Sequence, residues 1–295
     1  MSYRDSQPGT IRLSDYRVPP FLVDSTDLVI ELGETETTVR STLAMRRNPR
    51  SEDSQALLEL HGVDLDIRRI AIDGEPLDEG DYEFGGECLK VLRPVGLAFV
   101  FSAEVVIRPQ ENTSLEGLYK SRNLFCTQCE AEGFRKITFY PDRPDVMAEF
   151  TTTIIADQRR YPVLLSNGNP VARGAKDDRH WVTWHDPFRK PSYLFAVVAG
   201  DLAHVADTFT TASGRQVELR IYVEEKDLDK CDFAMASLKQ AMAWDERVYG
   251  REYDLDIYMI VAVDDFNMGA MENKGLNIFN ASAVLARQEI TTDAS

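Results

Sequence analysis

The residues best suited to chemistry lie between positions 267 and 280, in the stretch NMGAMENKGLNIFN. Gly269 and Ala270 are followed there by a carboxylate, Glu272, and an amide, Asn273. Small residues at the end of a strand let another backbone approach and pair with it. A neighbouring carboxylate can hold the α-amino group of a peptide, which has a pKa of about 8 and is largely cationic at neutral pH. The pattern favours a binding site for a peptide N-terminus.

A clamp for an α-ammonium group needs a second carboxylate. Glu130 is a candidate because it closely follows Gln128 in a loop, although the sequence alone does not bring it near position 272. The structural alternative also stays open at this point. In that interpretation the acids belong to a solvated loop, while Met268 and Met271 are ordinary core residues flanking a plain turn.

Other residue patterns do not indicate metal or redox chemistry. Cys126 and Cys129 form a Cys-x-x-Cys pair, but a structural zinc site needs a second ligand pair, and the two remaining cysteines are isolated. We therefore expect two incidental thiols. No His-Glu-x-x-His motif occurs, and we expect the four histidines to be surface or satisfied core residues. These histidines are His61, His180, His185 and His204.

Composition limits the classes of function. The chain has 295 residues, 43% of them hydrophobic, which predicts two domains with a substantial core. Its formal net charge of -16 argues against binding to nucleic acid or to an anionic membrane surface. No run approaches the roughly 20 apolar residues of a spanning helix, and the polar residues 1–6 do not resemble a signal peptide. Four cysteines without a disulfide pattern favour a cytoplasmic location.

The elements that must position these residues change character near position 201. Short strands separated by Gly, Pro and Asn predict an all-β sandwich or saddle over residues 1–200, with a hairpin turn at Asp73-Gly74. The expected strands include residues 28–32, 37–45, 63–67, 70–72, 97–107, 150–156, 161–165, 181–184 and 193–198. Beyond 201, a strand over 217–223, a helix over 229–249 ended by Gly250 and a strand over 254–263 predict the beginning of an α/β domain.

Several segments resemble the gluzincin zinc aminopeptidases, particularly their bacterial branch. The motif Gly269-Ala-Met-Glu-Asn273 matches the substrate-recognition motif of that family, and the flanking "YDLDIYMIVAVDDF", "DPFRKPSYLFAVVAGDL" and "LFCTQCEAEGFRKITFYPDRPD" also match. The resemblance covers the chain from about residue 17 onward. It implies a β domain over 1–200 and the opening, α/β part of a thermolysin-like catalytic domain over 201–295, so the expected fold class is mainly β.

The resemblance also implies roles for individual residues. Glu272 and Glu130 would bind the α-amine of a peptide substrate, and Gln128 would line the same pocket. Met268 would border the pocket for the first side chain, while the motif backbone at positions 269 and 270 would pair with the peptide. The substrate-binding residues predicted in this way are Gln128, Glu130, Met268, Gly269, Ala270, Met271, Glu272 and Asn273.

The chain also departs from the family pattern, because the zinc ligands, the general base and the oxyanion-stabilising Tyr would all lie downstream of Ser295. We therefore expect an N-terminal portion, most simply a cloned fragment, of a zinc enzyme acting on peptides with a free N-terminus. We expect this portion to bind no zinc and to be inactive alone. The alternatives are a non-catalytic β scaffold or binding protein and a bifunctional epoxide-hydrolase-type relative. The sequence does not indicate an oligomeric state.

Overall fold

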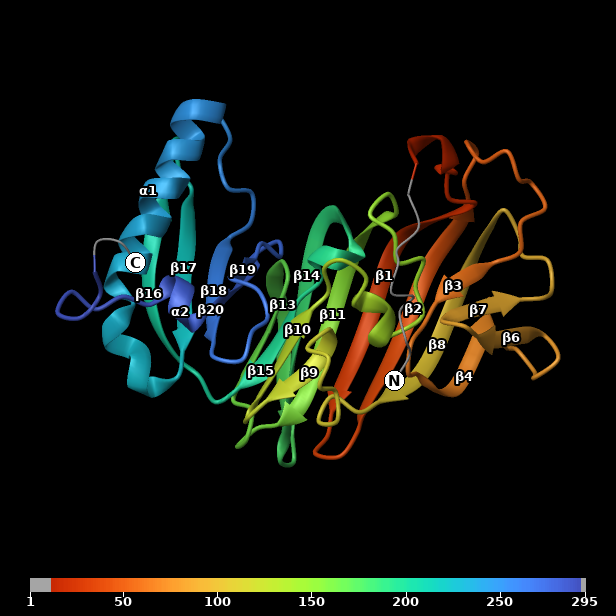
Figure 1. Cartoon of the computed structure of the whole chain (residues 1–295), viewed down its shortest axis with the longest axis horizontal. Helices are drawn as coiled ribbons and strands as arrows, with labels where there is room; N and C mark the ends of the chain where they lie inside the picture. The colour runs from red at the N-terminus through yellow and green to blue at the C-terminus, as the bar shows by residue number, and fades with distance from the viewer. Residues whose placement is uncertain (1–11, 293–295) are drawn as a thin grey trace.

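The computed structural model describes residues 12–292, and the expectation about residues 1–6 lies outside this range. The described residues form four β-sheets, one long helix and several short helical turns (Figure 1). The prediction of a mainly β fold with an α/β part at its C-terminal side is confirmed. No helix among residues 12–292 is long and apolar enough to cross a membrane.

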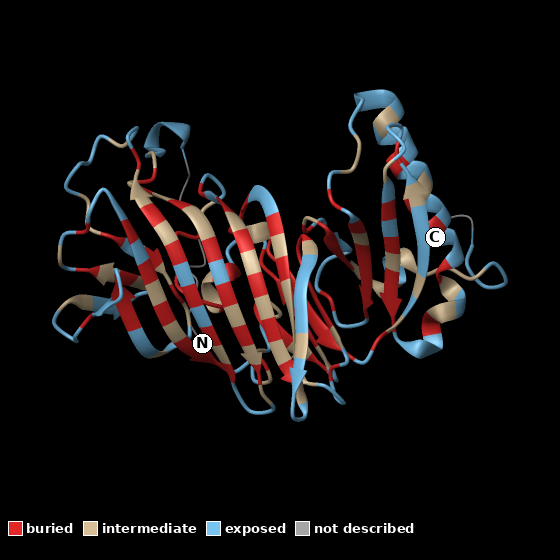
Figure 2. Ribbon diagram, turned by 180° about the vertical axis from the view of Figure 1, so that it is seen from behind, coloured by how far each residue is buried: buried red, intermediate tan, exposed pale blue. Residues whose placement is uncertain are grey.

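The largest sheet has eight strands and runs along the length of the β domain (Figure 1). Buried and less buried residues alternate along its central strands, which shows that one face is packed and the other is open (Figure 2). In spatial order its strands are β13 (Asn169–Lys176), β14 (Arg179–Pro191), β11 (Met147–Asp157), β1 (Phe21–Leu32), β2 (Thr37–Arg47), β8 (Ala98–Ile107), β4 (Asp66–Ile72) and β5 (Glu75–Pro76).

Two smaller sheets complete the β domain, and their buried residues share one hydrophobic core with the large sheet. Phe134, Tyr140, Phe150 and Phe195 pack ring against ring inside that core. The four-stranded sheet contains β12 (Val163–Ser166), β15 (Val197–Gly200), β10 (Leu124–Gln128) and β9 (Gly117–Ser121). The three-stranded sheet contains β3 (Glu59–His61), β7 (Cys88–Val91) and β6 (Tyr82–Gly85).

The C-terminal part is a five-stranded sheet with helix α1 (Asp232–Tyr249) on its outer side (Figure 1). Buried side chains of α1 form a second core with this sheet, and Gly250 ends the helix in the left-handed conformation, as expected. The strands, in spatial order, are β16 (Ala203–Thr210), β17 (Gln216–Val223), β18 (Ile257–Val263), β20 (Leu276–Asn280) and β19 (Ala270–Met271). The short helix α2 (Ala281–Val284) follows β20.

Local predictions had mixed outcomes. The hairpin at Asp73-Gly74 is confirmed: both residues have positive φ, and β4 pairs with β5 across them. The strand expected over 63–67 is partly wrong, because the chain bends at Val63 and Asp64, with φ of 54° at Asp64, and β4 starts only at Asp66. The strand expected over 193–198 is also partly wrong, since its first residues belong to the 3₁₀ helix Ser192–Leu194. The remaining 3₁₀ helices are Leu13–Asp15, Phe134–Lys136 and Glu225–Lys230.

The two parts of the chain share apolar contacts. One face of the five-stranded sheet contributes Met259, Val261 and Ile278 to the core of the β domain, while α1 covers the other face. The passage between the parts is short, because β15 ends at Gly200 and β16 begins at Ala203. The domain boundary at 201 stays a prediction.

Candidate functional site

Two residues of the Gly-Ala-Met-Glu-Asn stretch form the last strand of the five-stranded sheet, at the edge near the β domain (Figure 1). Ala270 and Met271 make up β19, which pairs antiparallel with Phe279 and Ile278 of β20. The spatial order β18-β20-β19 leaves the other side of β19 without a neighbouring strand in the described part of the chain. An edge strand offers free N–H and C=O groups to an added strand, so the backbone here can pair with an extended peptide.

The side chains of this stretch differ in exposure. Glu272 and Met268 are exposed, whereas Met271 is buried. Asn273 is only 1% exposed, yet neither atom of its amide has a hydrogen-bond partner among residues 12–292. The oxygen of the buried Gln128 amide is also without a partner there. Since buried amide groups are normally paired, both side chains keep unused hydrogen-bonding capacity.

The end of β10 meets this edge strand. Gln128 Nε2 lies 3.6 Å from the sulfur of Met271 and 3.4 Å from the backbone oxygen of Glu130. The structure therefore brings the two sequence segments together, although about 140 positions separate them. Glu130 follows Gln128 by two positions, and Glu272 directly follows Met271. Their predicted role in one amine clamp is not tested by these contacts and stays a prediction.

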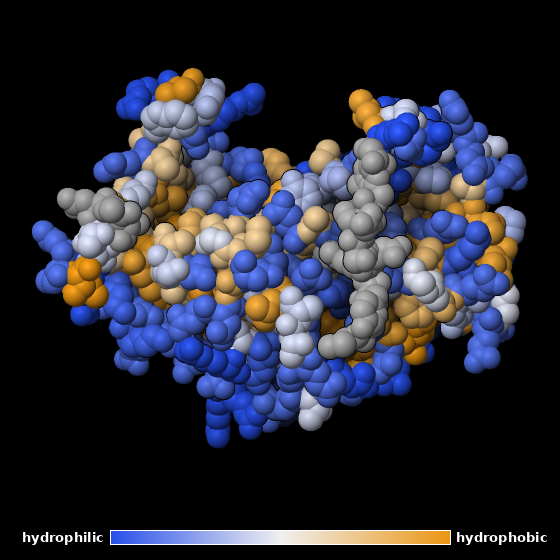
Figure 3. Space-filling view, in the orientation of Figure 1, coloured by the Kyte–Doolittle hydropathy of each residue, from blue (hydrophilic) through white to orange (hydrophobic). Residues whose placement is uncertain are grey.

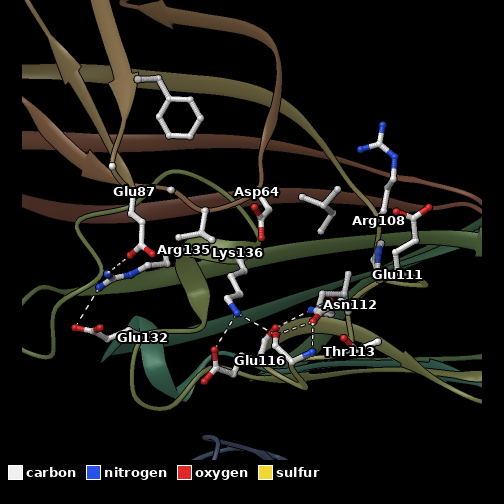
Figure 4. A pocket seen from close by; sticks show the side chains of 18 of the residues that line it. Asp64, Glu87, Arg108, Glu111, Asn112, Thr113, Glu116, Glu132, Arg135 and Lys136 are labelled. Atoms are coloured by element: carbon white, nitrogen blue, oxygen red, sulfur yellow. Dashed lines mark hydrogen bonds and ion pairs between the residues drawn. The ribbon is translucent and has the colours of Figure 1, made fainter. Parts of the chain in front are cut away.

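The loop after Gln128 also borders a hollow of about 950 Å³, which lies on the β-domain side (Figure 4). Charged side chains of both signs line it, and they pair with one another. Arg135 contacts Glu132 at 3.3 Å and Glu87 at 3.9 Å, while the Lys136 ammonium lies 2.9 Å from Glu116. These pairs occupy both of these cations, and the remaining lining acids Asp64 and Glu111 have no ion pair among residues 12–292, so the hollow carries more negative than positive charge.

The two acids of this loop, Glu130 and Glu132, differ in whether they have a cationic partner. Glu132 has Arg135 as its cationic partner. The carboxylates of Glu130 and Glu272, by contrast, have no ion pair or hydrogen bond with any residue in the described range. Of the acids near the contact between β10 and β19, Glu130 and Glu272 are therefore the two that remain open to an external cation.

The β domain also anchors the loop that leads into the motif, by residues that the sequence analysis did not identify. Ser121, at the tip of the β9–β10 hairpin, donates a hydrogen bond to the carboxylate of Asp265 over 2.7 Å. The neighbouring Arg122 donates to Asp264 over 2.9 Å. In the sequence, Asp264 and Asp265 stand out as two adjacent acids directly after an apolar strand, but nothing there indicates which residues they contact.

The cysteines and histidines lie in structural surroundings. Cys126 and Cys129 are buried, and burial raises the pKa of the Cys126 thiol to about 12. The thiol therefore stays protonated at neutral pH, whereas a metal ligand must be a thiolate. The four histidines contact different partners: His61 accepts from the Asp142 N–H, His180 contacts the Tyr161 carbonyl, His185 contacts the Thr151 hydroxyl and His204 packs on Tyr222. Residues 12–292 contain no cluster of His, Cys, Asp or Glu that could hold a metal, so they do not fit a zinc centre.

Apolar side chains also reach the surface in this part of the molecule. In the orientation of Figure 1, most of the surface is hydrophilic, and hydrophobic side chains gather in more than one place, including the region of β17 and β18 and the region of β3, β6 and β7 (Figure 3). Met268, at 43% exposure, is an exposed apolar residue of the motif. The candidate site therefore combines a free strand edge, two open carboxylates and an apolar side chain.

Comparisons with known proteins match both parts of the chain. Residues 24–194 match the family described as the Peptidase M1 N-terminal domain, and residues 233–295 match the Peptidase family M1 domain. Aminopeptidase N of Caulobacter vibrioides is 52% identical over 98% of this chain, and that of Escherichia coli is 52% identical over 97%. The chain covers 33% and 32% of these relatives, so it spans about a third of their length.

A solved structure has the same fold. The crystal structure of Legionella pneumophila aminopeptidase A in complex with aspartic acid matches 96% of this chain with a TM-score of 0.92 and 37% sequence identity. The match covers 33% of that protein.

Proposed function

The chain belongs to the peptidase M1 family, and from this membership we propose that it is the N-terminal part of a zinc aminopeptidase that removes N-terminal residues from peptides. Residues 1–200 would be the β domain and residues 201–295 the beginning of the catalytic domain. The aminopeptidase relatives support this activity, and the neighbour bound to aspartic acid shows that a related protein holds a molecule with a free α-amine.

The observation that carries the proposal is the pair of open carboxylates beside a free strand edge. Glu130 and Glu272 would hold the α-ammonium group of the substrate. The backbone of Gly269 and Ala270 would pair with the peptide, and Met268 would border the first side chain. The buried amides of Gln128 and Asn273 and the side chain of Met271 would form the floor of this clamp.

An acylated N-terminus would bind poorly in such a clamp, because it would leave two carboxylates facing a neutral group. Peptides with a free N-terminus are therefore the proposed partners, while nucleic acids and membranes are not. A cytoplasmic location also belongs to the proposal, and the free thiols of all four cysteines support it.

Zinc, which the aminopeptidases of this family use, would polarise the scissile carbonyl and activate water. Because residues 12–292 do not fit a zinc centre, we assign this chain the binding role alone and expect it to be inactive by itself. Its own residues would fix the amine and align the first peptide bond. The metal ligands would belong to other parts of the full-length polypeptide.

The test compares Glu130→Gln with Glu132→Gln in the full-length gene product. Both substitutions remove one carboxylate from the same loop, but only Glu132 already has a cationic partner. We expect Glu130→Gln to lower kcat/KM on peptides with a free N-terminus by roughly 10- to 150-fold, and Glu132→Gln to change it little. Equal effects of the two substitutions, or equal cleavage of free and N-acetylated peptides by the wild type, would overturn the proposal.

A further inference from the structure

The connection between β12 and β13 contacts the turn that follows the motif. Asn167, in this connection, is 3% exposed. Its amide nitrogen donates to the carbonyl of Lys274 over 2.8 Å and to the carbonyl of Leu194 over 3.0 Å, and its oxygen accepts from the N–H of Ala196 over 2.8 Å. One buried side chain thus ties the β domain to the backbone two residues after Glu272.

The rest of this connection reinforces the contact. A Cβ atom on Gly275 would lie 3.2 Å from the backbone nitrogen of Gly168, so the two backbones pack closely. Asn169, the first residue of β13, donates to the carboxylate of Asp256 over 3.0 Å and accepts from its N–H over 2.9 Å. Asp256 directly precedes β18, so residues 167–169 hold both the start of β18 and the turn after the motif.

Glu272 has no partner of its own within residues 12–292, so its backbone determines where its carboxylate lies. On one side, Ala270 and Met271 are fixed by pairing with β20. On the other side, the carbonyl of Lys274 is held by Asn167. If Asn167 is removed, the Gly275 carbonyl still accepts from the Met259 N–H and the Lys274 ammonium still pairs with Asp254, but the Lys274 carbonyl loses its side-chain partner from the β domain.

From these contacts we propose that Asn167 is a positioning residue for the α-amine clamp, acting through the Lys274 carbonyl on Glu272. The inference rests on the proposed aminopeptidase function. A displacement of about 1 Å in a group that aligns the reacting bond can lower the rate about 100-fold. Loss of Asn167 should therefore affect catalysis even where the protein remains folded.

The experiment uses the full-length gene product with Asn167→Ala and the isosteric Asn167→Asp. Ser166→Ala is the local control. The buried Ser166 hydroxyl, next to Asn167 in the sequence, donates to the carbonyl of Ala196 but does not contact Lys274. Asn48→Ala is the distant control, since this buried amide donates to the carbonyl of Pro19 over 2.8 Å. At a temperature where the variants are folded, we expect the Asn167 variants to lose about 10- to 100-fold in kcat/KM and the controls to lose little.

A double-variant cycle with Glu272→Gln separates positioning from general destabilisation. If Asn167 acts through Glu272, adding Asn167→Ala to Glu272→Gln should cost far less than it costs in the wild type. Additive losses, or equal losses in the Ser166→Ala control, would overturn the inference alone. A wild type without preference for a free N-terminus would overturn the proposed function and this inference with it. If Asn167→Asp does not fold, Asn167→Ala, which adds no charge to the core, answers the same question.

Discussion

The acidic residues near the candidate site differ mainly in whether each carboxylate already has a cationic partner. Glu130 and Glu132 are both exposed acids of one loop, but Arg135 contacts only Glu132. An isolated carboxylate next to a free strand edge can bind an ammonium group, whereas a carboxylate that already has a cation gains much less from a second one. The same difference separates Glu272, which has no partner in the described range, from Asp264 and Asp265, which Arg122 and Ser121 contact.

Glu272→Gln should damage catalysis by the full-length protein more than it damages folding. Gln keeps the shape and hydrogen-bonding capacity of the side chain but loses its charge. A charge-assisted hydrogen bond contributes about 1.5–3 kcal/mol, so kcat/KM should fall roughly 10- to 150-fold while the melting temperature changes little. Steady-state kinetics and thermal unfolding on the same variant check this. A lowered melting temperature with unchanged kinetics would mean that Glu272 is a structural residue.

A buried ion pair behaves differently from these open acids. The ammonium group of Lys190 lies 3.0 Å from Asp186 and over the ring of Phe150, with both charged side chains almost fully buried. Breaking a buried pair leaves an uncompensated charge, so Asp186→Asn should lower the free energy of unfolding by about 3–5 kcal/mol. The double variant Asp186→Asn/Lys190→Met should cost far less. Denaturant unfolding of the four proteins measures this, and additive losses would contradict it.

The sequence was informative about residues whose chemistry is visible without a partner. Small residues next to Glu272 indicated strand pairing, and β19 is indeed an edge strand. Asn167, Ser121 and Arg122 were missed, because their importance comes from carbonyls and carboxylates 107 to 144 positions away. Such contacts depend on the packing of two sheets, which no local pattern encodes.

At the scale of elements, strands with a buried face could be predicted from the sequence better than bends and exposed strands. Hydrophobic alternation and the Asp73-Gly74 signal located many strands, while the bend at Val63 and Asp64 was missed, because Val63 and Leu65 alternate like a strand although Asp64 has a positive φ. The exposed β16 was not predicted either. Its side chains are mostly polar or small, so it lacks the buried face on which such predictions rely.

Two glycines with positive φ allow the packing of the motif turn to be measured. Gly250 has φ of 61° and open space where a Cβ atom would lie, whereas a Cβ on Gly275 would lie 2.9 Å from Leu255 and 3.2 Å from Gly168. Gly250→Ala should cost about 1–2 kcal/mol of stability from backbone strain alone. Gly275→Ala should cost a further 1–3 kcal/mol or so from overpacking. Equal losses in denaturant unfolding would show that the turn is loosely packed.

The stability of the whole molecule should depend on pH through Lys190. Burial lowers the pKa of Lys190 from its usual 10.5 to about 8 in the folded state. Between these two values the unfolded chain binds more protons than the folded one, so the free energy of unfolding from this group rises with pH. We expect a rise from pH 8 to 9.5 in denaturant titrations. The Asp186→Asn/Lys190→Met variant is the control, and an identical rise in that variant would contradict the assignment.

The shared core links the two parts of the chain into one body. Residues 1–200 alone would leave uncovered the apolar surface that Met259, Val261 and Ile278 contact. We expect this shorter piece to bind a hydrophobic dye and to self-associate, whereas the 295-residue chain should do so much less. Dye fluorescence and sedimentation check the difference. A monomeric piece that binds no dye would show that the boundary at 201 separates independent units.

This shared core also affects how the protein is made. A ribosome delivers the β domain first, and its apolar face stays open until the strands up to Asn280 have emerged. At about 5–20 residues per second, that delay lasts several seconds. During this time the nascent chain presents an exposed hydrophobic surface to chaperones and to neighbouring nascent chains. Slow codons between positions 200 and 280 would lengthen the exposure, so translation speed in this segment should affect the yield of folded protein.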